Sequence, residues 1–303
     1  MAAQEGSAKA QAMSLAARRH VIPFALWMIL LLLVQQLHLT DVVESHEGNV
    51  TRGLALLSMG GAYAWRVALG LGALLLLRPW HGCGYARLER RHVLPALAVG
   101  VGVFLLWVGL ETEFVKGLCP GLADLYEKWC VLPFGKLRAP SVFIRLQAVT
   151  DNPLVPGLDG QFFPVTPTTP IPEGYAAAEG SAIGNFYAPS VCGWGIALLR
   201  LAGSAFVISV IEEFFWRGFL YRWIQKIDFL DIDPGKLALP AFLATAVIFG
   251  AEHTEWLAGI LCGLAYGYLY VKTRDIWAAC IAHVTTNLLL GVYVLVFGAY
   301  QFW

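Results

Sequence analysis

Residues 21–39 read VIPFALWMILLLLVQQLHL, an uncharged apolar stretch 19 residues long. A helix that crosses a bilayer needs about 20 such residues. The composition of the whole chain agrees, because 58% of its 303 residues are apolar, only 14% are charged, and the mean hydropathy is +0.63. Soluble domains carry about 25% charged residues. These values exclude an ordinary soluble enzyme and predict an integral membrane protein.

Further apolar blocks follow along the chain, at residues 53–77, 93–110, 192–223, 237–250, 256–271 and 276–303. The last block is long enough for one tilted span or for a span with a short turn back. We therefore predict an all-α fold, a polytopic transmembrane bundle of seven or eight helices. The first block could instead be a signal peptide, but it exceeds the usual length of about 7 to 15 residues and no small-residue cleavage pattern follows it.

The distribution of basic residues predicts the orientation in the membrane. Basic side chains precede the first block and lie between the second and third, whereas the loop after the first block is mainly acidic. Because short cytoplasmic loops are enriched in Lys and Arg, the N-terminus is expected in the cytoplasm and residues 111–189 outside it. The chain carries 21 basic and 21 acidic residues, so no net charge favours a nucleic-acid partner.

The sequence divides into four segments. They are a disordered tail (residues 1–17), three transmembrane helices (18–110), an extracytoplasmic segment rich in Pro and Gly (111–189) and a second group of transmembrane helices (190–303). The external segment is predicted to be either a lid or a poorly ordered spacer. Within it, Cys119 and Cys130 could form a disulfide if that compartment is oxidising.

Charged residues interrupt the fourth apolar block, where residues 209–219 read SVIEEFFWRGF. Charges inside a span are unfavourable unless they are paired or hydrated, so they should face the bundle interior. Glu213 and Arg217 are four residues apart and share a helix face, which favours an ion pair between them. Glu212 points elsewhere and is left without a basic partner on this helix.

Two later blocks carry polar residues of their own, in Phe249–His253 (FGAEH) and His283–Asn287 (HVTTN). At 1.5 Å per residue, Glu212, His253 and His283 lie roughly 16, 21 and 10 Å from the predicted cytoplasmic ends of their helices. They can therefore share one layer near the middle of the membrane. Taken separately, these residues have simpler interpretations. His253 could be a histidine that its surroundings satisfy, and His283 and Asn287 could form a hydrogen bond between helices.

A layer of this composition suits hydrolysis. A carboxylate in a low-dielectric pocket can take a proton from water, and an imidazole can help to hold that water. A second imidazole and a side-chain amide supply donors for the oxyanion of a tetrahedral intermediate. Two His and two Glu could alternatively bind Zn²⁺, but the usual His-Glu-x-x-His helix is absent. We predict no metal and no cofactor, with zinc as the alternative.

The ordered set Glu212-Glu213-x-x-x-Arg217, Phe249-x-x-x-His253 and His283-x-x-x-Asn287 resembles the three signature motifs of the CPBP family, the CAAX-protease and bacteriocin-processing intramembrane endopeptidases. The resemblance covers roughly residues 190–290. It implies a cavity within the membrane that opens to the cytoplasm and to lipid. It also implies that Glu212 and His253 activate water, that His283 and Asn287 form the oxyanion hole, and that Glu213, Arg217 and Phe249 support the site.

The activity implied by this resemblance is endoproteolysis near the C-terminus of a membrane-anchored or lipidated protein. Short loops and spans rich in Ala, Leu and Gly suggest a bacterial inner membrane, where prenylated substrates are uncommon, so a membrane-anchored C-terminal segment is the expected substrate. The competing hypotheses are a catalytically silent scaffold or immunity protein, and a transporter that uses Glu212 and His283 as a proton relay. A transporter is less favoured because the sequence lacks two matching halves.

Overall fold

The computed structural model describes residues 2–36, 49–81, 83–85, 87–111, 121, 154–156, 162–164, 187–253 and 255–303. Within these residues the chain forms seven helices, counting the segment from Pro189 to Trp223 as one helix with a kink at the non-helical Gly193. The others are α1 (Ala2–Gln36), α2 (Asn49–Leu77), α3 (Arg90–Glu111), α12 (Leu239–Ala251), α13 (Trp256–Thr273) and α14 (Ile276–Phe297). Two single-turn 3₁₀ helices, η5 (Phe229–Asp231) and η6 (Tyr300–Phe302), complete the helical structure described. The predicted all-α bundle is confirmed.

The described chain also contains one short antiparallel strand pair that the sequence did not predict. Strand β1 (Leu154–Pro156) pairs with β2 (Phe162–Pro164), with Val155 opposite Phe163. Most of the segment 111–189, including Cys119 and Cys130 with their predicted disulfide, lies outside the described residues. At the N-terminus, a disordered tail was expected up to residue 17, but α1 already begins at Ala2.

Four of the helices are long and apolar enough to cross a membrane: Ala10–Leu33, Arg90–Leu110, Cys192–Trp223 and Ile276–Phe297. The chain is an integral membrane protein. The block at residues 237–250 was predicted to span the bilayer, but α12 has only 13 residues. At 1.5 Å per residue it covers about 20 Å, less than the hydrocarbon thickness of about 30 Å.

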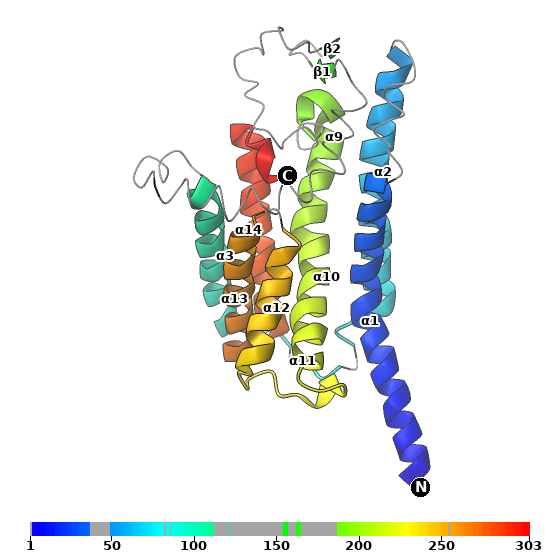
Figure 1. Ribbon diagram of the computed structural model, residues 1–303, viewed down its shortest axis with the longest axis vertical. Coiled ribbons are helices and arrows are strands. Elements are labelled where there is room, and N and C mark those ends of the chain that lie inside the picture. Colours follow the sequence, from blue (N-terminus) through cyan, green and yellow to red (C-terminus); the bar gives the residue numbers. More distant parts are fainter. Residues whose placement is uncertain are drawn as a thin grey trace.

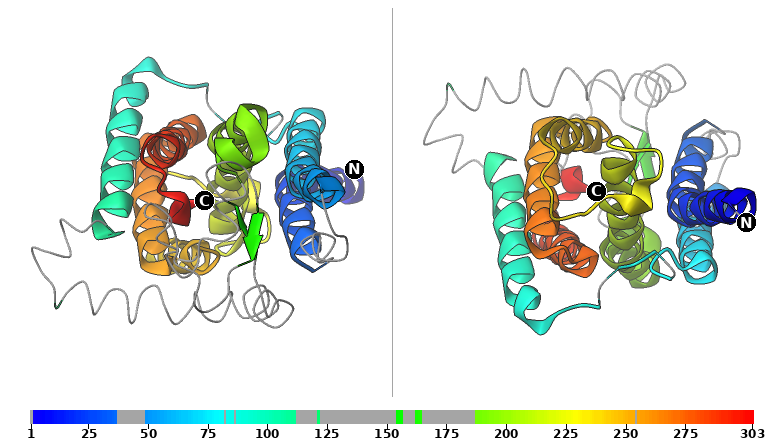
Figure 2. Two further views of the ribbon diagram at one scale, coloured as in Figure 1. Left: turned by 90° about the horizontal axis from the view of Figure 1, so that it is seen from above. Right: turned by 90° about the horizontal axis from the view of Figure 1, so that it is seen from below.

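The long helix lies at the centre of the bundle. Figures 1 and 2 show α1 and α2 on one side of it, and α3, α13 and α14 on the other. It contacts α2 near its start, α14 in its middle and α1 toward its end. Ser209, Ile211 and Glu213 in its middle turns are buried among these helices, whereas Phe206 on another face is 53% exposed.

Two π-helical stretches interrupt the α-helical geometry of this central helix. Its parts are α9 (Pro189–Ala202), η3 (Gly203–Ile208), α10 (Ser209–Glu213), η4 (Phe214–Leu220) and α11 (Tyr221–Trp223). A π-helical turn holds one more residue than an α-turn and often occurs at functional sites. Here one stretch precedes and the other follows the short segment that carries Glu212 and Glu213, and together they set the direction in which these carboxylates point.

Gly100 determines how closely α3 approaches α14. A Cβ added at Gly100 would lie 2.5 Å from the backbone oxygen of Ala282 and 2.6 Å from Cβ of Thr285. At this contact, Thr286 Oγ1 donates a hydrogen bond of 2.9 Å to the carbonyl of Gly100. Any side chain at this position would displace the helix that carries His283.

We expect Gly100→Ala to lower the free energy of unfolding by about 1–3 kcal/mol, because the added methyl group meets rigid backbone. Gly102 provides a matched control on the same helix, since a Cβ there would meet nothing within 4 Å. Gly102→Ala should leave stability unchanged or raise it by up to about 1 kcal/mol, because Ala is the better helix former. Unfolding of both variants in detergent checks this, and equal stabilities would contradict it.

Candidate active site

A buried carboxylate, Glu213, joins the central helix to α14. Its side chain is 0% exposed, and its Oε1 accepts hydrogen bonds of 2.9 Å from Arg217 Nη1 and from His283 Nδ1. The ion pair expected from the four-residue spacing of Glu213 and Arg217 is present. The bond to His283 was not predicted, because the sequence does not show which carboxylate faces α14.

Arg217 extends the same network to α12 and α13. Its Nη2 donates to the carbonyl of Gly263 in α13 at 3.0 Å, and its guanidinium carbon lies 4.8 Å from the ring centre of Phe249 in α12. One cation thus contacts three helices at a place where its charge is balanced by Glu213. The contacts among Glu213, Arg217 and Phe249 are present, while their supporting roles in catalysis stay a prediction.

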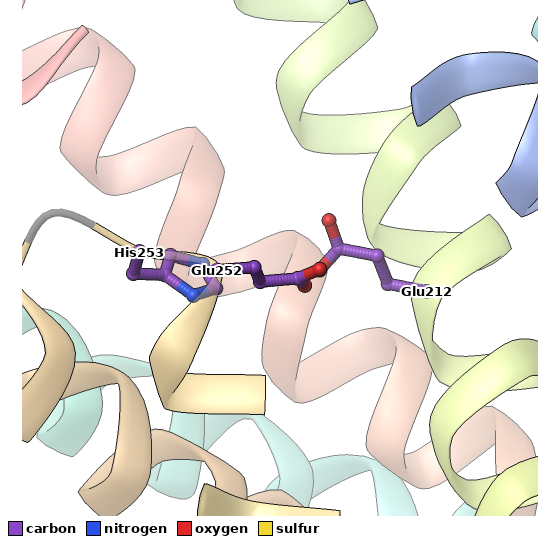
Figure 3. Close-up of side chains that lie close together, drawn as sticks. All are labelled: Glu212, Glu252 and His253. Carbon is purple, nitrogen blue, oxygen red and sulfur yellow. The ribbon is translucent and has the colours of Figure 1, made fainter. Parts of the chain in front are cut away.

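Glu212 points toward the C-terminal end of α12. Its carboxylate, the carboxylate of Glu252 and a ring nitrogen of His253 all lie within 4.8 Å of one another. In Figure 3, Glu212 reaches across from the central helix toward Glu252 and His253. Two carboxylates this close do not both remain ionised unless a proton or a cation lies between them. The group can therefore hold a proton in transit, a polarised water or a divalent cation.

The hydrogen bond of His253 determines its tautomer. Nδ1 lies 2.8 Å from the carbonyl oxygen of Phe249. A carbonyl oxygen only accepts, so Nδ1 carries the proton and Nε2 of the neutral ring is an acceptor. The ring also packs edge to face against Trp107, with centroids 5.4 Å apart. The imidazole is therefore oriented so that Nε2 can accept a proton or bind a water molecule.

His283 lies between the two carboxylates of the central helix. Nδ1 is bonded to Glu213, while Nε2 lies 3.8 Å from Oε2 of Glu212. The ring stacks on Tyr266, with centroids 5.0 Å apart. Because Nδ1 donates to a carboxylate, Nε2 becomes a donor only when the ring carries both protons. The oxyanion role expected for His283 thus requires a ring that carries a proton on both nitrogens.

Asn287 uses both hydrogens of its amide within the protein. Nδ2 donates to the carbonyl of Ser204 at 3.0 Å and to Ser209 Oγ at 2.9 Å, while Ser209 Oγ donates to the same carbonyl at 3.0 Å. Ser204 belongs to η3, whose wide turn leaves this carbonyl accessible to side chains. For Asn287 to bind an oxyanion, one of these neutral acceptors must be replaced. A charged oxygen is the stronger acceptor, so the exchange is favourable.

A cavity of about 170 Å³ adjoins this polar layer. His253, His283 and Asn287 line it together with Ser204, Arg200 and Trp303. It extends toward the end of the bundle where α14 ends and the central helix begins. In the predicted orientation this end is extracytoplasmic, but the orientation is itself a prediction, and the opening of a cavity to the cytoplasm stays a prediction with it. Toward the other end of the bundle, buried side chains that include Phe214, Tyr221 and Tyr270 form a core cluster.

The structure brings all four predicted catalytic residues into one region, with Glu212 and His283 in direct proximity and His253 and Asn287 on the same cavity. Sequence reasoning missed Glu252, Ser204 and Ser209. A signal for Glu252 existed, because it is a carboxylate beside His253 at the end of an apolar block. No comparable signal distinguished the two serines from ordinary small residues of a membrane helix.

Comparison with known families gives one finding. Residues 194–289 match the family model described as type II CAAX prenyl endopeptidase Rce1-like. The matched segment contains all three motifs on which the resemblance rested, and that prediction is confirmed over this segment. No curated protein and no solved structure matches the chain significantly.

Proposed function

We propose that this protein is an intramembrane endopeptidase that hydrolyses a peptide bond near the C-terminus of a membrane-anchored or lipidated protein. The observation that carries the proposal is the grouping of Glu212 with His253 on one side and His283 on the other, beside a cavity in a membrane protein. The match to an endopeptidase family over the same residues supports the reaction class.

In the proposed reaction, water lies between Glu212 and His253. Glu212 takes a proton from this water as its oxygen attacks the scissile carbonyl, and Nε2 of His253 orients the water by accepting its second hydrogen bond. The doubly protonated His283 and the amide of Asn287 stabilise the oxyanion. The proton then passes from Glu212 to the leaving amine. Glu252 keeps this proton near Glu212 because the two carboxylates share it.

Part of the same site also fits the ligand set of a zinc ion. Glu212, Glu252 and His253 provide three ligand atoms within 4.8 Å, the number of protein ligands that a catalytic zinc site uses. A bound zinc ion would supply an activated water at neutral pH. We propose the glutamate mechanism because Glu212 can act as the base, and His283 and Asn287 can act as donors, without a metal ion.

Cleavage of a reporter peptide with a membrane-spanning segment and a free C-terminus tests the proposal. We expect the wild-type protein in detergent to cleave it, and His253→Ala and Asn287→Ala to lower kcat/KM by about 100-fold each. A divalent-metal chelator should leave the rate unchanged, whereas loss of activity restored by Zn²⁺ would favour the metal mechanism. Unchanged cleavage in both variants would refute the assignments, and no cleavage by the wild type of any peptide would favour a scaffold.

A further inference from the structure

Two arginines lie within apolar helices and make no ion pair with any described residue. Arg66 belongs to the apolar part of α2, Gly61–Leu77, and is 8% exposed, and the half-buried Arg200 belongs to the central helix. The Nε atoms of both side chains are buried and have no hydrogen-bond acceptor in the part of the chain that the structure describes. A guanidinium at membrane depth is unfavourable unless an anion, a carbonyl or water satisfies it. These two cations therefore require an explanation.

Aromatic rings surround both guanidinium groups. Cζ of Arg66 lies 4.8 Å from the ring centres of both Trp27 and Tyr63, and the Tyr63 hydroxyl is its neutral polar neighbour. Cζ of Arg200 lies 5.0 Å from the ring centre of Tyr63 and 4.4 Å from that of Tyr187. A ring face attracts a cation but does not replace a carboxylate as acceptor for the N–H groups. The arrangement holds the arginines in place but gives their Nε–H groups no acceptor among the described residues.

Tyr63 places the two cations close to each other, since both guanidinium groups contact the same ring. Its hydroxyl donates to the carbonyl of Arg200 at 3.1 Å, which ties α2 to the central helix. Two like charges in a medium of low dielectric repel each other strongly. An anion bound beside them would remove this repulsion and satisfy the N–H groups at once.

Arg200 also lines the cavity that contains His253, His283 and Asn287. The cation therefore faces the same space as the polar layer. Trp303, whose ring centre lies 5.7 Å from Cζ of Arg200, lines the cavity as well. An anionic group that entered this space with a peptide would meet Arg200 at one end and the polar layer at the other.

We propose that Arg200, assisted by Arg66, binds the C-terminal carboxylate of the peptide that is cleaved in this cavity. The proposal rests on the proposed function and specifies its substrate class, a chain with a free carboxylate a few residues after the scissile bond. A guanidinium binds a carboxylate through two parallel hydrogen bonds, which positions the peptide as well as attracting it.

Distances along the helix agree with a short C-terminal segment. Arg200 and Glu212 lie on one helix, with their Cα atoms about 18 Å apart along its axis. An extended chain advances about 3.4 Å per residue. Arg200 lines the cavity, and Glu212 lies within 4.8 Å of His253, which lines it too. A carboxylate at Arg200 would therefore place a bond about five residues upstream near Glu212. The enzyme would thus select the bond by its distance from the C-terminus.

A pair of reporter peptides with one sequence, ending in a free acid or in an amide, tests this proposal. We expect the wild type to cleave the acid with a kcat/KM about 10- to 100-fold higher than the amide, as expected for a charged hydrogen bond. Arg200→Gln should bring the ratio of acid to amide close to one, and Arg66→Gln should lower it less. The exposed Arg91 serves as a charge-matched control, so Arg91→Gln should keep the wild-type ratio.

Equal cleavage of acid and amide by the wild type, or an unchanged ratio in Arg200→Gln, would overturn the proposal. Measuring the binding of the same labelled peptides to the wild type and to Arg200→Gln tests the carboxylate site independently of the proposed endopeptidase activity. If no peptide is cleaved but the acid binds more tightly than the amide in an Arg200-dependent way, the carboxylate site stands and the endopeptidase does not. A tightly bound phospholipid that is lost from Arg200→Gln, with no acid preference, would assign the site to a lipid phosphate instead.

Discussion

Glu212→Gln is expected to reduce peptide cleavage by about 10⁴-fold, the upper range for loss of a general base. Glutamine has almost the same shape as glutamate, so the helix packing is kept while the proton acceptor is removed. The effect should appear in kcat more than in KM, because the base acts in the transition state. Reporter cleavage, with unfolding curves to show that the variant is folded, provides the measurement.

Two further isosteric variants test whether the loss of cleavage is specific to Glu212. Glu252→Gln removes the neighbouring carboxylate and should reduce cleavage less than Glu212→Gln does, because Glu252 assists the proton transfer rather than accepting the first proton. Asp233→Asn removes an exposed carboxylate that pairs with Arg274 on the surface and should have no effect. If Glu252→Gln were the more damaging variant, the role of base would belong to Glu252. If Glu212→Gln retained a tenth of wild-type activity, the mechanism would be wrong.

The second large effect is expected for the buried ion pair of Glu213 and Arg217. Arg217→Met removes the cation while approximately keeping its volume, and it leaves Glu213 in the core with only His283 as a partner. Breaking a buried pair from one side costs about 3–5 kcal/mol. We therefore expect a loss of that size in the free energy of unfolding, measured by denaturation in detergent.

The double variant Glu213→Gln/Arg217→Met should regain most of this stability, because no buried charge then remains uncompensated. Lys226→Met is the matched control, since it removes a surface cation that pairs with Asp231 at 2.8 Å. An exposed pair contributes at most about 1 kcal/mol. Similar losses in Arg217→Met and Lys226→Met would show that burial does not govern the contribution of the pair.

Much of the site was accessible to sequence reasoning because charge is rare in membrane helices. Glu212, Glu213 and Arg217 stand out against apolar neighbours, and their spacing separates the pair from the remaining carboxylate. The four-residue spacing of His283 and Asn287 places both on one face of α14. The distance of each motif from the end of its helix then predicts that all three motifs lie at one level in the membrane. None of these steps requires knowledge of how the helices pack.

The direction of Glu252 and the hydrogen bonds of Asn287 could not be predicted from the sequence. Glu252 adjoins the end of α12 at residue 251, where helical periodicity no longer predicts direction, and only the fold turns it toward Glu212. The hydrogen bonds of Asn287 depend on the carbonyl of Ser204, which η3 makes accessible. A π-helical turn adds a residue without changing the hydropathy pattern, so the sequence carries no visible sign of it.

By itself, the sequence determined that this protein is a bundle of membrane helices and which polar residues interrupt its apolar blocks. It could do so because a backbone in lipid must satisfy its own hydrogen bonds, which favours helices. The length of each apolar block then shows directly whether its helix can cross the membrane. Only the tertiary structure decided which carboxylate contacts which imidazole, on which side of the polar layer the cavity lies, and that Arg66 and Arg200 meet at one ring. These features depend on how each helix is rotated about its axis, and that rotation is set by packing between residues far apart in the chain.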